Sequence, residues 1–149
     1  MENLVEVKNL KKNYGSKEAV KDISFNIKEN EILGLLGPNG SGKTTTIGMM
    51  LGLLKPSNGE ILIDGKKIEE NRIETLQKIN FISPYIELPK KLTVKQNLVV
   101  YCKLYNVSDI KNRIEYLVEK LRLEDLLNRV TGELSSGQKN RASLAKALI

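Results

Sequence analysis

The chain has 149 residues, enough for a domain with a sizeable core, and its 40% hydrophobic and 28% charged residues argue against a disordered polypeptide. Its apolar runs fall short of the ~18 residues that a membrane-spanning helix needs, and Glu2 and Glu6 interrupt the N-terminus where a signal peptide would be apolar. We therefore expect a cytoplasmic protein, in keeping with the single cysteine, Cys102, which forms no internal disulfide.

The net charge of +6 permits contact with nucleic acid or anionic lipid. The basic residues are scattered, however, and occur as pairs such as Lys11-Lys12 and Lys66-Lys67 rather than as a stripe with interleaved aromatic residues. We interpret them as a solvated surface and expect no nucleic-acid partner.

The first predicted elements are two strands that form an antiparallel hairpin. Apolar residues alternate within residues 4–14 and again within residues 23–27, and Gly15-Ser16 between them is a turn signal. Tyr14 immediately precedes this turn. Its ring either packs as an ordinary strand-end residue or stacks on a purine base, and the residues alone leave both roles open.

Residues 32–51 are predicted to form a strand, a glycine loop and a helix. An apolar run at 32–36 precedes GPNGSGKT, which fits the pattern G-x-x-x-x-G-K-[ST] at every fixed position. The glycines let the backbone curl so that amide N–H groups converge, and the helix beginning near Lys43 adds unpaired N–H groups and a positive dipole end. A glycine-rich surface turn is the alternative, which the flanking strand and helix disfavour.

This loop is therefore predicted to bind a nucleoside triphosphate. Lys43 can reach the β- and γ-phosphates, and the Thr44 hydroxyl can bind Mg²⁺. The predicted ATP-binding residues of the loop are Gly37, Pro38, Asn39, Gly40, Ser41, Gly42, Lys43, Thr44 and Thr45.

Glycine, proline and asparagine residues within 52–59 close the loop helix before a short strand at 61–63. Residues 68–76 are weakly helical, and residues 80–82 are predicted as another short strand that ends at Ser83-Pro84.

Apolar residues then repeat at helical spacing. A helix is predicted over 94–105 with Thr93 as N-cap, and another over 110–121, introduced by Ser108 or Asp109. Two helices without an intervening strand indicate a helical subdomain inserted into an α/β core.

Residues 131–138 form a polar, glycine-bearing turn that opens a last helix, whose N-terminal N–H groups are a second potential phosphate site. The sequence LSSGQ within it resembles the LSGGQ signature of the ATP-binding-cassette (ABC) ATPases, and it follows the phosphate loop at a distance that fits this family. Other P-loop proteins lack this pair of motifs, which disfavours a nucleotide kinase. The signature residues are Leu134, Ser135, Ser136, Gly137 and Gln138.

The resemblance implies an α/β fold with a P-loop NTPase (RecA-like) core, an N-terminal antiparallel β hairpin and an inserted helical subdomain. Residues 1–83 would hold the β subdomain and nucleotide core, and residues 84–149 the Q-loop region, helical subdomain and signature helix. Tyr14 resembles the aromatic residue of the family's A-loop, which stacks on adenine. Two cassettes of the family meet head to tail, so the signature of one approaches the ATP held by Lys43 of the other.

Two departures from the family pattern matter. The Q-loop glutamine, which binds Mg²⁺ and contacts the membrane subunit, is replaced at the matching position by Pro84, and neither Ser83 nor Tyr85 can replace a side-chain amide. Family members also continue into a Walker B strand that ends in Asp-Glu and into a switch histidine, whereas this chain stops at Ile149 and contains no histidine. We therefore expect a fragment, truncated before Walker B, that lacks catalytic residues, binds ATP weakly and does not hydrolyse it.

The function implied is that of the ATP-binding subunit of an ABC transporter, most similar to bacterial export-type cassettes. Its cofactors would be ATP and Mg²⁺, and its partners a second cassette and a transmembrane permease at the inner face of the membrane. A non-transport ABC ATPase that acts on ribosomes or DNA is the alternative, favoured by the net charge of +6 and by the missing glutamine. Without the Walker B strand, the phosphate-loop strand would expose backbone donors and apolar side chains, so we expect low solubility or partial disorder.

Overall fold

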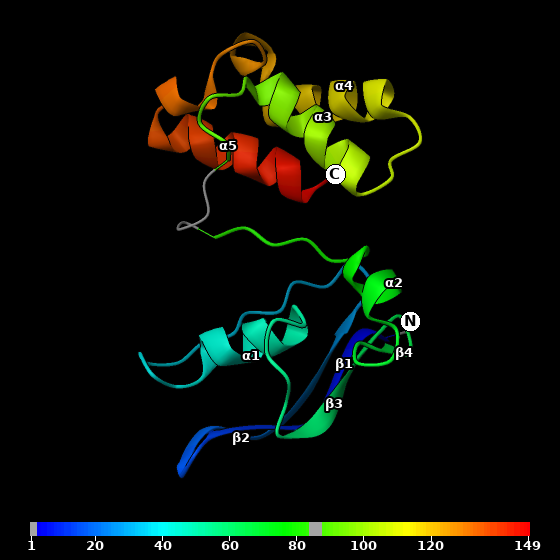
Figure 1. The fold of residues 1–149 in the computed structure, drawn as a ribbon, viewed down its shortest axis with the longest axis vertical. Coiled ribbons are helices and arrows are strands. Elements are labelled where there is room, and N and C mark those ends of the chain that lie inside the picture. The colour runs from blue at the N-terminus through cyan, green and yellow to red at the C-terminus, as the bar shows by residue number, and fades with distance from the viewer. Residues whose placement is uncertain (1–2, 84–87) are drawn as a thin grey trace. The chain divides into compact units, whose positions relative to one another are not determined.

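A computed structural model describes residues 3–83 and 88–149 of the chain. The chain divides into two compact units, Met1–Ile79 and Asn80–Ile149, of which the first holds the strands and the second holds the longer helices (Figure 1). Pro84 and Tyr85, at the predicted Q-loop position, lie outside the described residues. Within the described residues, no helix is both long enough and apolar enough to cross a membrane.

The first unit is built on a four-stranded sheet in the order β2-β1-β3-β4, in which every neighbouring pair is antiparallel. The predicted hairpin is confirmed, because β1 and β2 pair along their lengths and meet at Tyr14 opposite Lys17. The strands are β1 (Asn3–Tyr14), β2 (Lys17–Lys28), β3 (Asn58–Ile63) and β4 (Lys66–Lys67). Buried apolar residues of this sheet pack with Met49 of the loop helix and form the core of the unit.

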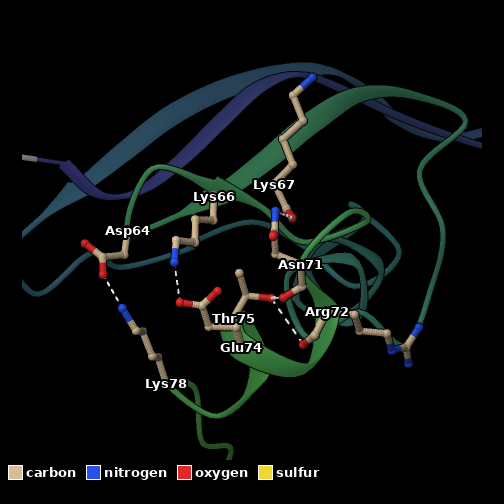
Figure 2. Close-up of polar contacts among 8 residues, drawn as sticks. All are labelled: Asp64, Lys66, Lys67, Asn71, Arg72, Glu74, Thr75 and Lys78. Atoms are coloured by element: carbon tan, nitrogen blue, oxygen red, sulfur yellow. Dashed lines mark hydrogen bonds and ion pairs between the residues drawn. The ribbon is translucent and has the colours of Figure 1, made fainter.

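Two short helices complete the first unit: α1 (Lys43–Met50) and α2 (Arg72–Leu76). Figure 2 shows how side chains connect α2 and Lys78, two residues after it, to the β3–β4 hairpin, through ion pairs from Glu74 to Lys66 and from Lys78 to Asp64. The hydrogen bond from Lys78 lowers the pKa of Asp64. A helix of five residues is too short to be stable alone, so these contacts and the core hold it in place.

The second unit contains α3 (Val94–Leu104), α4 (Ile110–Leu121) and α5 (Ser136–Ala147), with two short 3₁₀ helices between α4 and α5. The predicted cap at Thr93 is confirmed: its hydroxyl oxygen accepts from the Gln96 N–H, and the Gln96 side chain accepts from the Thr93 N–H. Of the two candidate caps for α4, the structure selects Asp109.

Residues at the start of the second unit are tied to α5 by a lysine. The Lys146 ammonium donates hydrogen bonds to the Phe81 carbonyl at 2.9 Å and to Asn80 Oδ1 at 3.2 Å, and it lies 5.2 Å from the centroid of the Tyr101 ring. Burial lowers the pKa of Lys146. These contacts explain why Asn80 groups with the helices rather than with the sheet.

The predicted strands at 32–36 and 80–82 are wrong for this structure. Neither segment pairs with another strand in the described part of the chain, and Ile32 and Leu36 are 99% and 92% exposed. Both runs have the composition of strands, but a strand exists only when a neighbour completes its hydrogen bonds. In the described part of the chain, the sheet of the first unit is formed by β1 to β4, and residues 32–36 do not join it.

We predict that the exposed apolar residues at 32–36 drive self-association of the chain. Replacing Ile32 and Leu36 together by serine should raise the concentration at which the chain associates by about tenfold or more, since each such side chain contributes about 1.5–3 kcal/mol when buried. Sedimentation velocity over a concentration series measures this.

The control pair is Ile73→Ser with Leu104→Ser, which removes two other exposed apolar side chains, 79% and 65% accessible, from helices. This pair should leave association unchanged. An unaltered chain that stays monomeric and melts in one cooperative transition would contradict the prediction.

Candidate nucleotide-binding site

The phosphate loop reaches α1 through two glycines in left-handed backbone conformations. Gly40 has φ 83° and Gly42 has φ 90°, which only glycine adopts without strain. A Cβ atom at Gly42 would lie 2.4 Å from the Ala19 carbonyl oxygen of β2. The loop therefore passes so close to the sheet that the last glycine of the motif is required for packing as well as for its backbone angle.

The side chain of Lys43 folds back over its own loop. Its ammonium donates hydrogen bonds to the carbonyl oxygens of Gly37 at 2.7 Å and Pro38 at 2.8 Å. This cation thus sits at the curl of the loop, where a bound phosphate chain would offer it stronger, anionic acceptors.

The N-terminus of α1 has open hydrogen-bond donors. No side chain caps it, no acidic residue lies in its first turn, and Thr46 is the first residue whose N–H reaches back to the Gly42 carbonyl, at 2.8 Å. The N–H groups of Lys43, Thr44 and Thr45 precede this first helical bond, so they have no acceptor within the helix. A polyphosphate could accept hydrogen bonds from these N–H groups. The positive dipole end of the helix and the Lys43 ammonium would both attract its negative charge.

The donor set also fits Mg²⁺ arriving with a nucleotide. The described residues contain no cluster of three or more His, Cys, Asp or Glu side chains that could hold a metal ion by itself. Thr44 lies exposed at the start of α1, where its hydroxyl can join phosphate oxygens around the ion. The ion would then bind as the Mg²⁺ complex of the triphosphate.

Tyr14 lies in the same unit as the phosphate loop, at the end of β1. Its side chain is 49% exposed, so part of the ring is open to a ligand. The Lys12 ammonium lies 5.2 Å from the ring centroid, a contact that the sequence analysis did not anticipate. Alternation along a strand, which places residues two apart on one face, is the sequence signal that could have indicated it.

The signature turn lies in the second unit and begins α5. Ser135 is the N-cap: its hydroxyl oxygen accepts from the Gln138 N–H at 3.4 Å, and Gln138 Oε1 accepts from the Ser135 N–H at 2.9 Å. Ser136 and Gly137 are exposed, whereas Leu134 is buried at 5% exposure. The capping box thus satisfies two donors, and the Ser135 hydroxyl proton and Gln138 Nε2 take no part in it.

Two buried polar side chains, Asn97 and Thr131, hold the chain in place just before this turn. The Thr131 hydroxyl donates to the Pro89 carbonyl at 2.7 Å, and Asn97 Nδ2 donates to the Thr93 carbonyl at 3.1 Å and to the Pro89 carbonyl at 3.3 Å. Both polar side chains are almost fully buried, with Asn97 1% and Thr131 3% exposed. These hydrogen bonds hold Thr131, just before the signature turn, against the segment that leads into α3.

The predicted site residues therefore divide between the units. Tyr14 and the phosphate loop, 37–45, belong to the first unit, and the signature, 134–138, belongs to the second. Within the first unit, the loop meets β2 where Gly42 approaches Ala19, and Tyr14 ends β1, the strand next to β2. The second set forms the N-terminus of α5, where Ser135, Ser136 and Gly137 are exposed and Leu134 is buried.

Comparison with known proteins assigns a family to this arrangement. The family profile described as "ABC transporter" matches residues 20–149. The bacitracin transport ATP-binding protein BcrA of Bacillus licheniformis is 37% identical over 152 residues, covering 100% of this chain and 48% of that protein. The SkfA peptide export ATP-binding protein SkfE of Bacillus subtilis is 37% identical, covering 98% of this chain and 61% of that protein.

Solved structures share the fold. A structure described as the ATP binding subunit of an ABC transporter matches with a TM-score of 0.87 and 29% identity, over 97% of this chain and 61% of that one. CbiO1 of Clostridium perfringens, described as part of the transporter complex CbiONQ, matches with a TM-score of 0.84 and 31% identity, over 99% and 62%. The predicted α/β ABC ATPase fold is thereby confirmed. The chain spans about half the length of several curated relatives that it matches.

The close approach of the phosphate loop to β2 can be tested with two alanine variants. Gly42→Ala should lower the free energy of unfolding by about 2–5 kcal/mol, because it adds a clash with the Ala19 carbonyl to the strain of a left-handed backbone. Gly40→Ala, whose Cβ would meet nothing within 4 Å, should cost only the backbone strain of about 1–2 kcal/mol. Urea unfolding followed by circular dichroism measures both, and equal losses would contradict the predicted packing.

Proposed function

The chain belongs to the ABC transporter family, and on that premise we propose that it is the ATP-binding subunit of a transporter, in which ATP binding and hydrolysis drive transport by a membrane partner. The observation that carries this proposal is the uncapped N-terminus of α1 with the Lys43 ammonium folded onto the loop in front of it. A site of this kind favours a chain of phosphates, because a helix N-terminus with unsatisfied N–H groups and an adjacent cation both attract anions. Mg²⁺ would bind between the phosphates and Thr44.

Export is the direction that the relatives favour. BcrA and SkfE carry names that refer to bacitracin transport and peptide export, and both cover nearly all of this chain. The transported substrate would be set by the membrane partner rather than by these residues. The protein would then work at the cytoplasmic face of the membrane.

A second cassette is the partner that the signature turn implies. Ser136 and Gly137 are exposed at a helix N-terminus, and the capping box leaves the Ser135 hydroxyl proton and Gln138 Nε2 as donors. In a head-to-tail pair, these groups would approach the γ-phosphate of an ATP held by the partner subunit. Each ATP site is then incomplete until two copies, or this chain and a related cassette, associate.

The alternative function, action on ribosomes or DNA, finds support in the net charge of +6. Several lysines, however, are paired with acidic side chains, including Lys11 with Asp22 and Lys67 with Glu60. The acidic partners offset part of the positive charge, which a nucleic-acid-binding face would need to concentrate. Salt-sensitive co-sedimentation with ribosomes or DNA would favour this alternative, whereas co-purification with a multispanning membrane protein would favour transport.

We predict that Mg-ATP binding depends on Lys43. Lys43→Ala should weaken binding at least about tenfold, since it removes a charge-assisted contact worth about 1.5–3 kcal/mol. Isothermal titration calorimetry with Mg-ATP measures this. Lys21→Ala removes the same charge from an exposed position of β2 and should bind ATP as the unaltered chain does.

We expect binding without turnover from residues 1–149, because they contain no histidine to serve as the family's switch residue and no Walker B glutamate. ATP hydrolysis that disappears in the Lys43→Ala variant would contradict this expectation. Absence of ATP binding by the unaltered chain would overturn the proposed function.

A further inference from the structure

Lys12 of β1, which lies outside the phosphate loop, contacts both the segment before β3 and the predicted base-stacking ring. The ammonium of Lys12 donates a 2.7 Å hydrogen bond to the Lys55 carbonyl and lies 5.2 Å from the centroid of the Tyr14 ring. The hydrogen bond fixes the position of a cation that would otherwise sample many rotamers. The ring therefore has a positive charge held against it.

The anchor places this charge on a particular flank of β1. In the sheet order, β1 lies between β2 and β3. Lys55 shortly precedes β3, and the neighbouring Ser57 N–H donates to the Lys11 carbonyl at 2.8 Å, so the anchor lies on the β3 flank. The phosphate loop instead meets β2, where Gly42 approaches Ala19. Lys12 is thus anchored to the segment that precedes β3.

A cation held over an aromatic ring has two effects on a ligand that stacks on the ring. It restricts the ring's orientation, and it leaves the ring face away from the cation for the ligand. Tyr14 is 49% exposed, so the ring is not enclosed by protein.

We propose that Lys12 is a positioning residue for the nucleotide base: anchored on the Lys55 carbonyl, it holds the Tyr14 ring so that the base of a bound nucleotide stacks on the ring face away from the ammonium. This inference rests on the proposed ATP-binding function and names a further residue of the same site. It predicts that Lys12 contributes to the binding of the base and not to the binding of the phosphates.

The test compares two ligands that share phosphates but differ in having a base. Calorimetry would measure the dissociation constants of Mg-ATP and of Mg-tripolyphosphate for the unaltered chain and for Lys12→Met, which keeps an apolar stem and removes the charge. The dissociation constant of Mg-ATP should rise about two- to fivefold in the variant. That of Mg-tripolyphosphate should change no more than in Lys21→Met, the control for loss of one exposed charge.

Two further variants connect the effect to the ring. Lys12→Arg keeps a donor and a cation that stacks on aromatic rings, so it should bind Mg-ATP nearly as the unaltered chain does. In a Tyr14→Ala background, Lys12→Met should have no further effect on Mg-ATP.

Several results would overturn the inference while leaving the proposed function intact. Equal weakening of ATP and tripolyphosphate would make Lys12 a general phosphate contact or a fold residue. Tighter ATP binding in Lys12→Met would mean that the ammonium occupies the stacking face. If Lys12→Met weakened Mg-ATP binding just as much in the Tyr14→Ala background, Lys12 would not act on the base through the ring. Failure of the unaltered chain to bind ATP would instead overturn the proposed function itself.

Discussion

The N-terminus of α1 presents amide donors that no side chain caps, and the local structure around it follows from this constraint. An ordinary helix start is satisfied by a Ser, Thr, Asp or Asn side chain, but here the N-cap is Gly42, squeezed against the Ala19 carbonyl of β2. A larger residue has no room there. The donors of the first turn consequently remain for an external anion, and Lys43 is positioned to meet the same anion.

The contrast with α5 shows why two glycine-bearing helix ends in one chain need not act alike. At α5, Ser135 and Gln138 cap each other, which satisfies two donors before any ligand arrives. That end can add a few donors to a phosphate already held elsewhere, whereas the end of α1 can bind a whole phosphate chain. The proposed division of labour, with the loop as primary site and the signature as a completing contact from another copy, agrees with this difference in capping.

Features encoded by neighbouring residues were predictable from the sequence. Thr93 with Gln96 forms the capping box that a Thr three residues before a Gln suggests, and the hairpin follows from alternation on both sides of Gly15-Ser16. The absence of a strand at 32–36 was not predictable in this way, because strand formation depends on a partner that is often distant in the sequence. Its apolar composition was correctly recognised, yet the residues lie exposed without a ladder.

In the candidate site too, some residues were predictable from the sequence and others were not. The phosphate loop has a motif whose spacing dictates its geometry, so the sequence alone identifies its residues. The roles of Lys12, Asn97 and Thr131 depend on contacts between segments far apart in the chain, such as Thr131 with Pro89, and no local pattern reveals them. Site residues that act through packing or through a neighbour's ring therefore required the structure.

The most direct test of the account is an amide NMR titration of the chain with Mg-ATP at a concentration where it is monomeric. We predict that the largest shifts occur at the Lys43, Thr44 and Thr45 amides, with little change at Ser136 and Gly137 until copies associate. Comparable shifts at both helix ends in the monomer, or shifts confined to the signature turn, would contradict the claim that the uncapped N-terminus of α1 is the primary phosphate site.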